Sequence, residues 1–127
     1  MDPQYITKPI NLHKGDPEQK RAEILSYFKK TYSLDEHLFE VFADTSAMYR
    51  TADPLRHPLI FYFGHTAAFY INKLVISKIL ETRINPKFES MFAIGVDEMS
   101  WDDLNQSNYK WPTIEEIKSY RKQVYEI

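Results

Sequence analysis

The sequence predicts an all-α fold, a bundle-like layer of about three long helices. Apolar residues recur at helical spacing in several segments, and capping residues or prolines stand where those segments begin. The chain has 127 residues, 43% of them hydrophobic, and only 3 glycines. That length and composition favour a packed, regular fold with a real core.

Residues 1–15 contain two prolines and end in Lys14-Gly15, so we expect an extended lead-in. Asp16 is a good N-cap and Pro17 suits the first helical position, which predicts a helix over 17–32. Ser33 and Glu36 have capping-box spacing and predict the start of a second helix over 34–48. Residues 49–57 are then a connection.

The most hydrophobic segment follows Pro58. No proline occurs from Leu59 to Thr82, and the apolar pattern predicts one long buried helix there. The prolines at 86 and 112 then bound a segment, 86–111, that we expect to be irregular, with room for one short helix after Ser100. A last helix is predicted from Thr113 onward.

No stop signal follows the last helix, because no Gly or Asn stands after it and the chain ends on Ile127. This pattern leaves two interpretations open, a frayed natural terminus and a chain cut inside or just after a helix. If a fourth helix is missing, an apolar groove is left uncovered, and such grooves drive association. We therefore expect a homodimer or a larger species.

Charge and cysteine content exclude several function classes. The formal net charge is −2 and the sequence pI is about 6.1, which predicts no nucleic-acid partner and no anionic membrane surface. The absence of Cys excludes a disulfide framework and a thiolate metal site. The N-terminus lacks a signal-peptide pattern, and the longest apolar run is too short to span a bilayer. We expect a cytoplasmic protein.

The chain has four histidines: His13, His37, His57 and His65. His13 and His37 are expected at the surface, and His57, just before Pro58, is expected to cap or orient the long helix. Only His65 lies inside an almost wholly apolar helix, where each ring nitrogen needs a partner. The residues alone favour a core histidine bonded to a backbone carbonyl or a tyrosine. Asn72, two turns away on the same face, is a candidate polar neighbour. The downstream carboxylates are expected to form a solvated capping loop: Asp97, Glu98, Asp102 and Asp103.

The segment Arg56–Leu74 places Gly-His-Thr-Ala inside the apolar helix, and three further segments stand out along the chain: Gly15–Arg21, Arg83–Pro86 and Phe92–Leu104. Together, and in the same order, these four segments resemble the 5-histidylcysteine sulfoxide synthase family of ovothiol biosynthesis. Within this resemblance, Arg56–Leu74 is similar to the metal-helix signature of that family.

This resemblance implies that residues 16–127 form a DinB-like helical bundle domain truncated at its C-terminus, with the fourth helix missing. It implies an iron-dependent oxidoreductase, a non-haem Fe(2+) enzyme that uses O2 to join the sulfur of L-cysteine to the imidazole ring of L-histidine as a sulfoxide. The related ergothioneine enzyme acts on trimethylated histidine. Neutral imidazoles suit Fe(II) and leave coordination positions open for substrates.

In that family three histidines hold the iron, and the Gly-His-Thr-Ala histidine corresponds to His65. The other two come from a His-x-x-x-His-x-Glu motif that this sequence lacks. The resemblance therefore implies that His65 is a metal ligand, that Fe(2+) is incompletely coordinated by this chain, and that the chain is inactive alone. No other catalytic or cofactor-binding residue is carried over.

Two other functions are alternatives. One is a stand-alone DinB-like module with a binding or structural role. The other is a metal-dependent thiol transferase of the DinB type, for which His13, His37 and His57 lack the spacing that would complete a site with His65.

Overall fold

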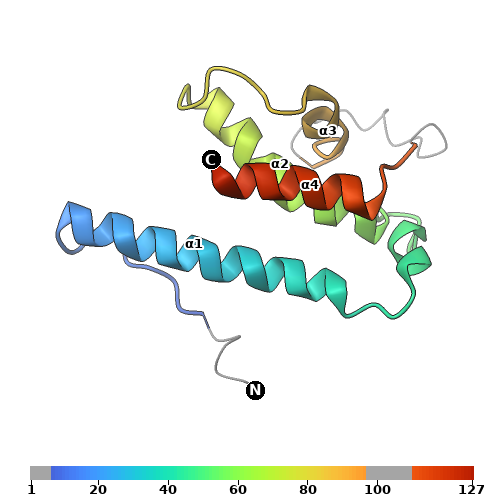
Figure 1. Cartoon of the computed structure of the whole chain (residues 1–127), viewed down its shortest axis with the longest axis horizontal. Helices are drawn as coiled ribbons and strands as arrows, with labels where there is room; N and C mark the ends of the chain where they lie inside the picture. The colour runs from blue at the N-terminus through green and yellow to red at the C-terminus, as the bar shows by residue number, and fades with distance from the viewer. Residues whose placement is uncertain (1–6, 97–109) are drawn as a thin grey trace. The chain divides into compact units, whose positions relative to one another are not determined.

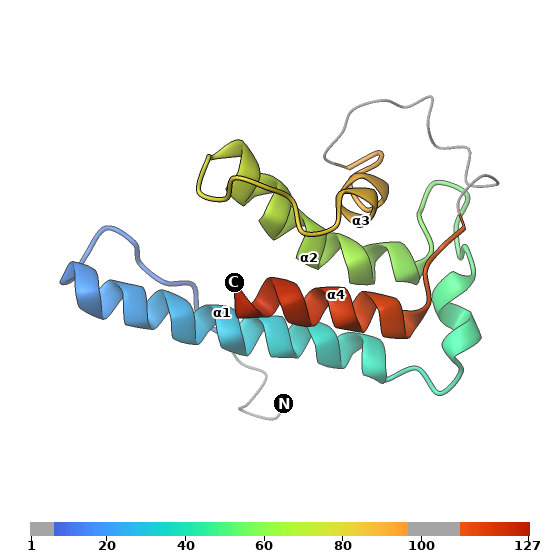
Figure 2. The same ribbon diagram turned by 45° about the horizontal axis from the view of Figure 1, so that its top comes forward.

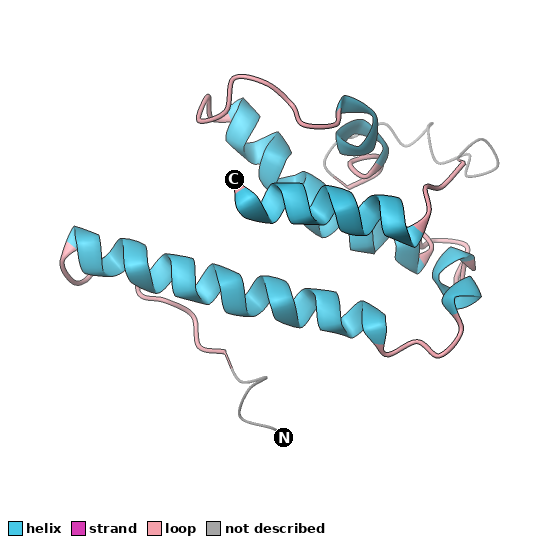
Figure 3. Ribbon diagram, in the orientation of Figure 1, coloured by secondary structure: helices cyan, strands magenta, loops and turns pink. Residues whose placement is uncertain are grey.

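The computed structural model describes residues 7–96 and 110–127. Figure 1 shows their helical segments in order: α1 (Pro17–Glu40), η2 (Thr45–Tyr49), α2 (Leu59–Ile76), α3 (Pro86–Met91) and α4 (Ile114–Glu126). Over the described residues Figure 3 shows helices and loops and no strand. The predicted all-α fold class is confirmed, while the DinB-like topology stays a prediction.

The chain divides into two compact units, one ending at Ala43 and one beginning at Asp44. The first contains the lead-in and α1, and the second contains η2, α2, α3 and α4. The lead-in over 1–15 followed by one bundle domain over 16–127 stays a prediction.

Helix α1 begins as the sequence predicts. The Asp16 carboxylate accepts hydrogen bonds from the backbone N–H groups of Glu18 and Gln19, each at 3.0 Å, and Pro17 occupies the first turn. These bonds satisfy two donors that a helix start leaves without a partner.

The predicted break near Ser33 is wrong, because α1 runs without interruption to Glu40. Neither glycine nor proline occurs between Pro17 and Glu40, so no residue forces the helix to stop. The predicted second helix over 34–48 is therefore the end of α1 followed by the short 3-10 helix η2, which the Asp44 carboxylate caps at Ser46 N with a 2.8 Å bond.

Helix α2 ends at Ile76, six residues earlier than predicted. The Ser77 hydroxyl donates to the Lys73 carbonyl at 2.8 Å, and Lys78 adopts a positive φ of 59°. The backbone N–H groups of Ile79 and Leu80 then both turn back to the Leu74 carbonyl. This left-handed turn ends the helix well before Pro86, the residue that was expected to stop it.

Helix α3 corrects a third prediction, since residues Pro86–Met91 are helical rather than irregular. The Asn85 side chain caps it by accepting from Phe88 N at 3.1 Å, and Pro86 occupies the first position. The predicted short helix after Ser100 lies outside the described residues. Helix α4 begins as predicted, with a complete capping box between Thr113 and Glu116.

The core of the second unit is built around α2, which contacts η2, α3 and α4. Figure 2 shows α4 running alongside α2, with the short α3 beside α2. By length and composition α2 could cross a membrane, as core helices of many soluble proteins could, and among the described helices it alone passes that test. Its buried residues include Ile60, Phe61, Phe63, Ala67, Ala68 and Ile71.

Gly64 allows α2 to approach the end of α3 closely. A Cβ added at Gly64 would lie 2.4 Å from ring atoms of Phe92, which is fully buried. The Phe92 ring therefore occupies the space that any other side chain at position 64 would need. This contact sets the separation between α2 and the residues that follow α3.

Two buried polar side chains join α4 to its neighbours. Arg121 is fully buried and donates to the Phe63 carbonyl at 2.6 Å and to the Thr66 hydroxyl at 2.7 Å. Its guanidinium also lies 4.6 Å from the centre of the Phe63 ring, in a cation–π contact. These bonds attach α4 to the middle of α2.

Glu89, on α3, is the second of these side chains and is also fully buried. Its Oε1 accepts from the backbone N–H groups of Ile84 and Asn85, at 3.0 and 2.9 Å, and from the Tyr120 hydroxyl at 3.3 Å. Its Oε2 is buried with no hydrogen-bond partner. Glu89 thus connects the loop before α3 with α4.

Replacing Gly64 with alanine should destabilise the second unit. The new methyl group collides with the Phe92 ring, and overpacking of this kind costs about 1–3 kcal/mol. Urea denaturation would measure the loss. The double variant Gly64→Ala, Phe92→Leu should lose less than the sum of the two single changes, and simple additivity would contradict the proposed collision.

Glu89→Ala should cost about 1–3 kcal/mol, because it leaves two backbone N–H donors buried without their acceptor. Glu89→Gln should cost less, since its amide oxygen retains both bonds and its NH2 group replaces the oxygen that has no partner. Thermal unfolding compares the two, with exposed Glu115→Ala as control. An equal loss of stability in the Ala and Gln variants would show that the hydrogen bonds from the Ile84 and Asn85 N–H groups contribute nothing.

Candidate functional site

His65 lies in the N-terminal half of α2, and its ring orientation is determined by one strong hydrogen bond. Its Nδ1 is 2.7 Å from the Phe92 carbonyl oxygen. A carbonyl only accepts, so Nδ1 carries the proton, and in the neutral ring Nε2 has the lone pair. A histidine held at one nitrogen by a carbonyl, with the other directed elsewhere, is the arrangement typical of a metal ligand. It is also what a core histidine adopts.

Aromatic rings enclose the His65 imidazole. The Phe61 ring, one turn earlier on α2, is nearly parallel to it, with centroids 5.5 Å apart and planes at 9°. The Phe69 ring, one turn later, meets it edge-on at 6.1 Å. The helical spacing of these residues predicts such contacts, and the rings limit the rotation of His65.

His57 lies on the opposite flank of Phe61, just before α2. Its ring stacks on Phe61 with centroids 3.9 Å apart, and its Nε2 donates to the Ile94 carbonyl at 3.2 Å. Its Nδ1 is buried with no hydrogen-bond partner. The sequence predicted a structural role for this residue, to cap or orient the long helix. The structure adds that His57 and His65 contact the same phenyl ring.

Burial lowers the pKa of His57. Desolvation is the largest cause, the hydrogen bond to the Ile94 carbonyl opposes it, and the electrostatic interaction with His65 adds to the lowering of this pKa. His57 is therefore neutral in the folded protein at pH 7.

The two remaining histidines belong to the first unit and are exposed, as the sequence predicts. The backbone N–H of His13 donates to the Asn11 side chain at 3.0 Å, and His37 lies 3.5 Å from the Glu40 carboxylate. Both contacts are local.

Asn72, the polar neighbour that the sequence suggested for His65, is buried, but it forms its hydrogen bond with α3 and not with the imidazole. Its Nδ2 donates to the Glu89 carbonyl at 2.9 Å, which ties α2 to α3. The Phe92 carbonyl takes the orienting role instead. The carboxylates at 97, 98, 102 and 103 lie outside the described residues.

A metal site needs more than His65. Among residues 7–96 and 110–127, no group of three His, Cys, Asp or Glu side chains lies close enough to hold a metal ion. His65 fits as one ligand through Nε2, and the described residues do not supply the others. Iron binding and its incomplete coordination by this chain both stay predictions.

The burial of two polar residues, Arg121 and Glu89, was not predicted from the sequence. A signal for Arg121 was present, because it lies four residues after Ile117 and three before Val124, on the buried stripe of α4. A charged residue in the middle of an apolar stripe indicates a buried hydrogen-bonding role. Glu89 had no such signal, because α3 itself was not predicted.

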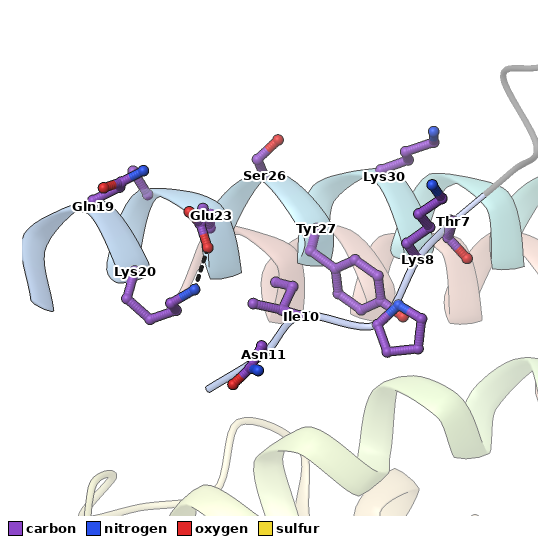
Figure 4. Close-up of a pocket in the computed structure, with 12 residues that line it drawn as sticks. Thr7, Lys8, Ile10, Asn11, Gln19, Lys20, Glu23, Ser26, Tyr27 and Lys30 are labelled. Atoms are coloured by element: carbon purple, nitrogen blue, oxygen red, sulfur yellow. Dashed lines mark hydrogen bonds and ion pairs between the residues drawn. The ribbon is translucent and has the colours of Figure 1, made fainter. Parts of the chain in front are cut away.

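A pocket also lies in the first unit, between the lead-in and the first half of α1. Figure 4 shows Ile10 and Tyr27 facing each other across it, with the Lys20–Glu23 ion pair at one end. The lead-in thus runs along α1. The pocket contains no histidine and has no bearing on His65.

No family model matches the chain. Ergothioneine biosynthesis protein 1 of Schizosaccharomyces pombe is 32% identical to it over 88 residues. The aligned region covers 62% of this chain and 11% of that relative, so the chain spans about a tenth of the relative's length. The match supports a distant relationship to an ergothioneine biosynthesis protein.

The lowered pKa of His57 predicts a loss of stability in acid. Because the unfolded chain binds a proton at about pH 6.5 and the folded chain resists it, this contribution is present above that pH and is lost as the pH falls below it. The urea midpoint should decline from pH 7.5 to pH 5.5, and less steeply in His57→Gln. Exposed His37→Gln is the control, and an equal change of slope in both variants would contradict the prediction.

Proposed function

We propose that this chain is a helical part of a non-haem iron(II)- and O2-dependent sulfoxide synthase, in which His65 is one of the iron ligands. The relationship to an ergothioneine biosynthesis protein supports the reaction class. The resemblance of the segment Arg56–Leu74 to the metal helix of the ovothiol enzymes favours L-cysteine and L-histidine as substrates.

The orientation of His65 is the observation that carries this proposal. The Phe92 carbonyl holds Nδ1, which selects the tautomer whose Nε2 can bind Fe(II). Gly64 belongs to the same arrangement, because without it Phe92 could not come close enough to offer that carbonyl. The Gly-His pair of the motif thus has a physical reason in this structure.

The reaction class balances with O2 as the oxidant. The thiol S–H and one ring C–H are lost, a carbon–sulfur bond and an S=O bond form, and the second oxygen atom leaves as water. Bound iron supplies O2 activation and a template for the two substrates. This chain contributes one imidazole, flanked by the rings of Phe61 and Phe69.

The test uses the longest natural polypeptide that carries this sequence. With Fe(II), O2, L-cysteine and L-histidine, mass spectrometry should detect the cysteine–histidine sulfoxide. Preference for trimethylated histidine would assign the ergothioneine reaction instead. No sulfoxide from either histidine would overturn the proposal.

His65→Asn separates metal binding from folding, because the Asn side-chain NH2 takes the position of Nδ1 and can still donate to the Phe92 carbonyl. Cobalt(II) absorption should show a loss of metal affinity of at least about tenfold, since one ligand is removed. His37→Asn is the matched control and should bind cobalt as the parent does. Unchanged binding in a folded His65→Asn variant would remove His65 from the ligand set.

A further inference from the structure

A cavity that does not include His65 lies between α3 and the segment entering α4. Its volume is about 340 Å3, in the range of small-molecule sites. Its lining includes Lys87, Phe88 and Met91 of α3, and Lys110, Trp111 and Glu116 from the other side.

The charges around this cavity leave one positive charge in excess. Lys87 and Lys110 each contribute an ammonium group, and Glu116 contributes one carboxylate. That carboxylate accepts from the Thr113 N–H at 2.7 Å and from its hydroxyl at 3.0 Å. The two bonds, and then the two lysines, hold the pKa of Glu116 below its usual value, so it stays ionised in its capping role.

The apolar part of the cavity is preorganised. Phe88 is buried, and Trp111 stacks on Phe92 with centroids 6.3 Å apart and planes at 16°. The following residue, Pro112, is held through its carbonyl by the Tyr49 hydroxyl at 3.2 Å. A flat apolar ligand would therefore meet rings that are already in position.

We propose that this cavity binds a small organic monoanion, a carboxylate carried on an aromatic or apolar body. The body packs against Trp111 and Phe88, and the carboxylate is held by Lys87 and Lys110. A neutral molecule of the same shape would leave the excess positive charge uncompensated. The proposal is independent of iron and of His65.

Phenylacetate is the probe, and phenylacetamide is its neutral match. In nitrogen–proton correlation spectra of the 127-residue chain, phenylacetate should shift the Trp111 indole resonance saturably, with a dissociation constant on the order of 1 mM. Trp101→Phe identifies that resonance. Phenylacetamide should bind at least about tenfold more weakly, because its body fits but its charge is absent.

The double variant Lys87→Gln, Lys110→Gln should weaken phenylacetate binding by at least about tenfold and leave phenylacetamide unchanged. Both lysines are exposed, so the fold should persist. Lys118→Gln, an exposed lysine of α4 outside the cavity, is the matched control. Absence of saturable shifts, equal affinity for both probes, or full affinity in the double variant would each overturn the proposal.

Discussion

The second unit depends on the close approach of α2 to the end of α3 at Gly64. Because position 64 has no side chain, the Phe92 ring can lie against the α2 backbone. The same residue then presents its carbonyl to His65 and its ring face to Trp111. One packing contact thereby controls the orientation of the candidate ligand and the position of an aromatic wall of the proposed anion cavity.

Two buried polar side chains also hold the helices of the second unit together. Arg121 attaches α4 to the backbone of α2, while Glu89 ties α4 to the loop before α3. Each bond directs a polar atom that apolar packing alone would leave free to shift. These bonds therefore fix the positions of α2, α3 and α4 around the core. One unfavourable feature remains, because Oε2 of Glu89 is buried with no hydrogen-bond partner.

The proposed function and the proposed anion cavity place different demands on the chain. Iron binding requires donors beyond His65, and the described residues bring no group of three such donors together. The cavity is lined entirely by described residues and needs nothing else. If both proposals hold, this helical unit supplies one oriented imidazole to a larger site and keeps a binding site of its own near Trp111.

The sequence by itself determined the all-α class, the start of α1 at Asp16 and Pro17, and the start of α4 at Thr113. These depend on local capping chemistry, which acts within one helical turn. It misplaced the end of α2 and divided α1 at Ser33, since capping-box residues also occur inside uninterrupted helices. Only the tertiary structure decided that Phe92, rather than Asn72, orients His65, and that Arg121 and Glu89 are buried. Those pairings join residues 27 to 58 positions apart, and they follow from how closely the helices pack, which no local pattern records.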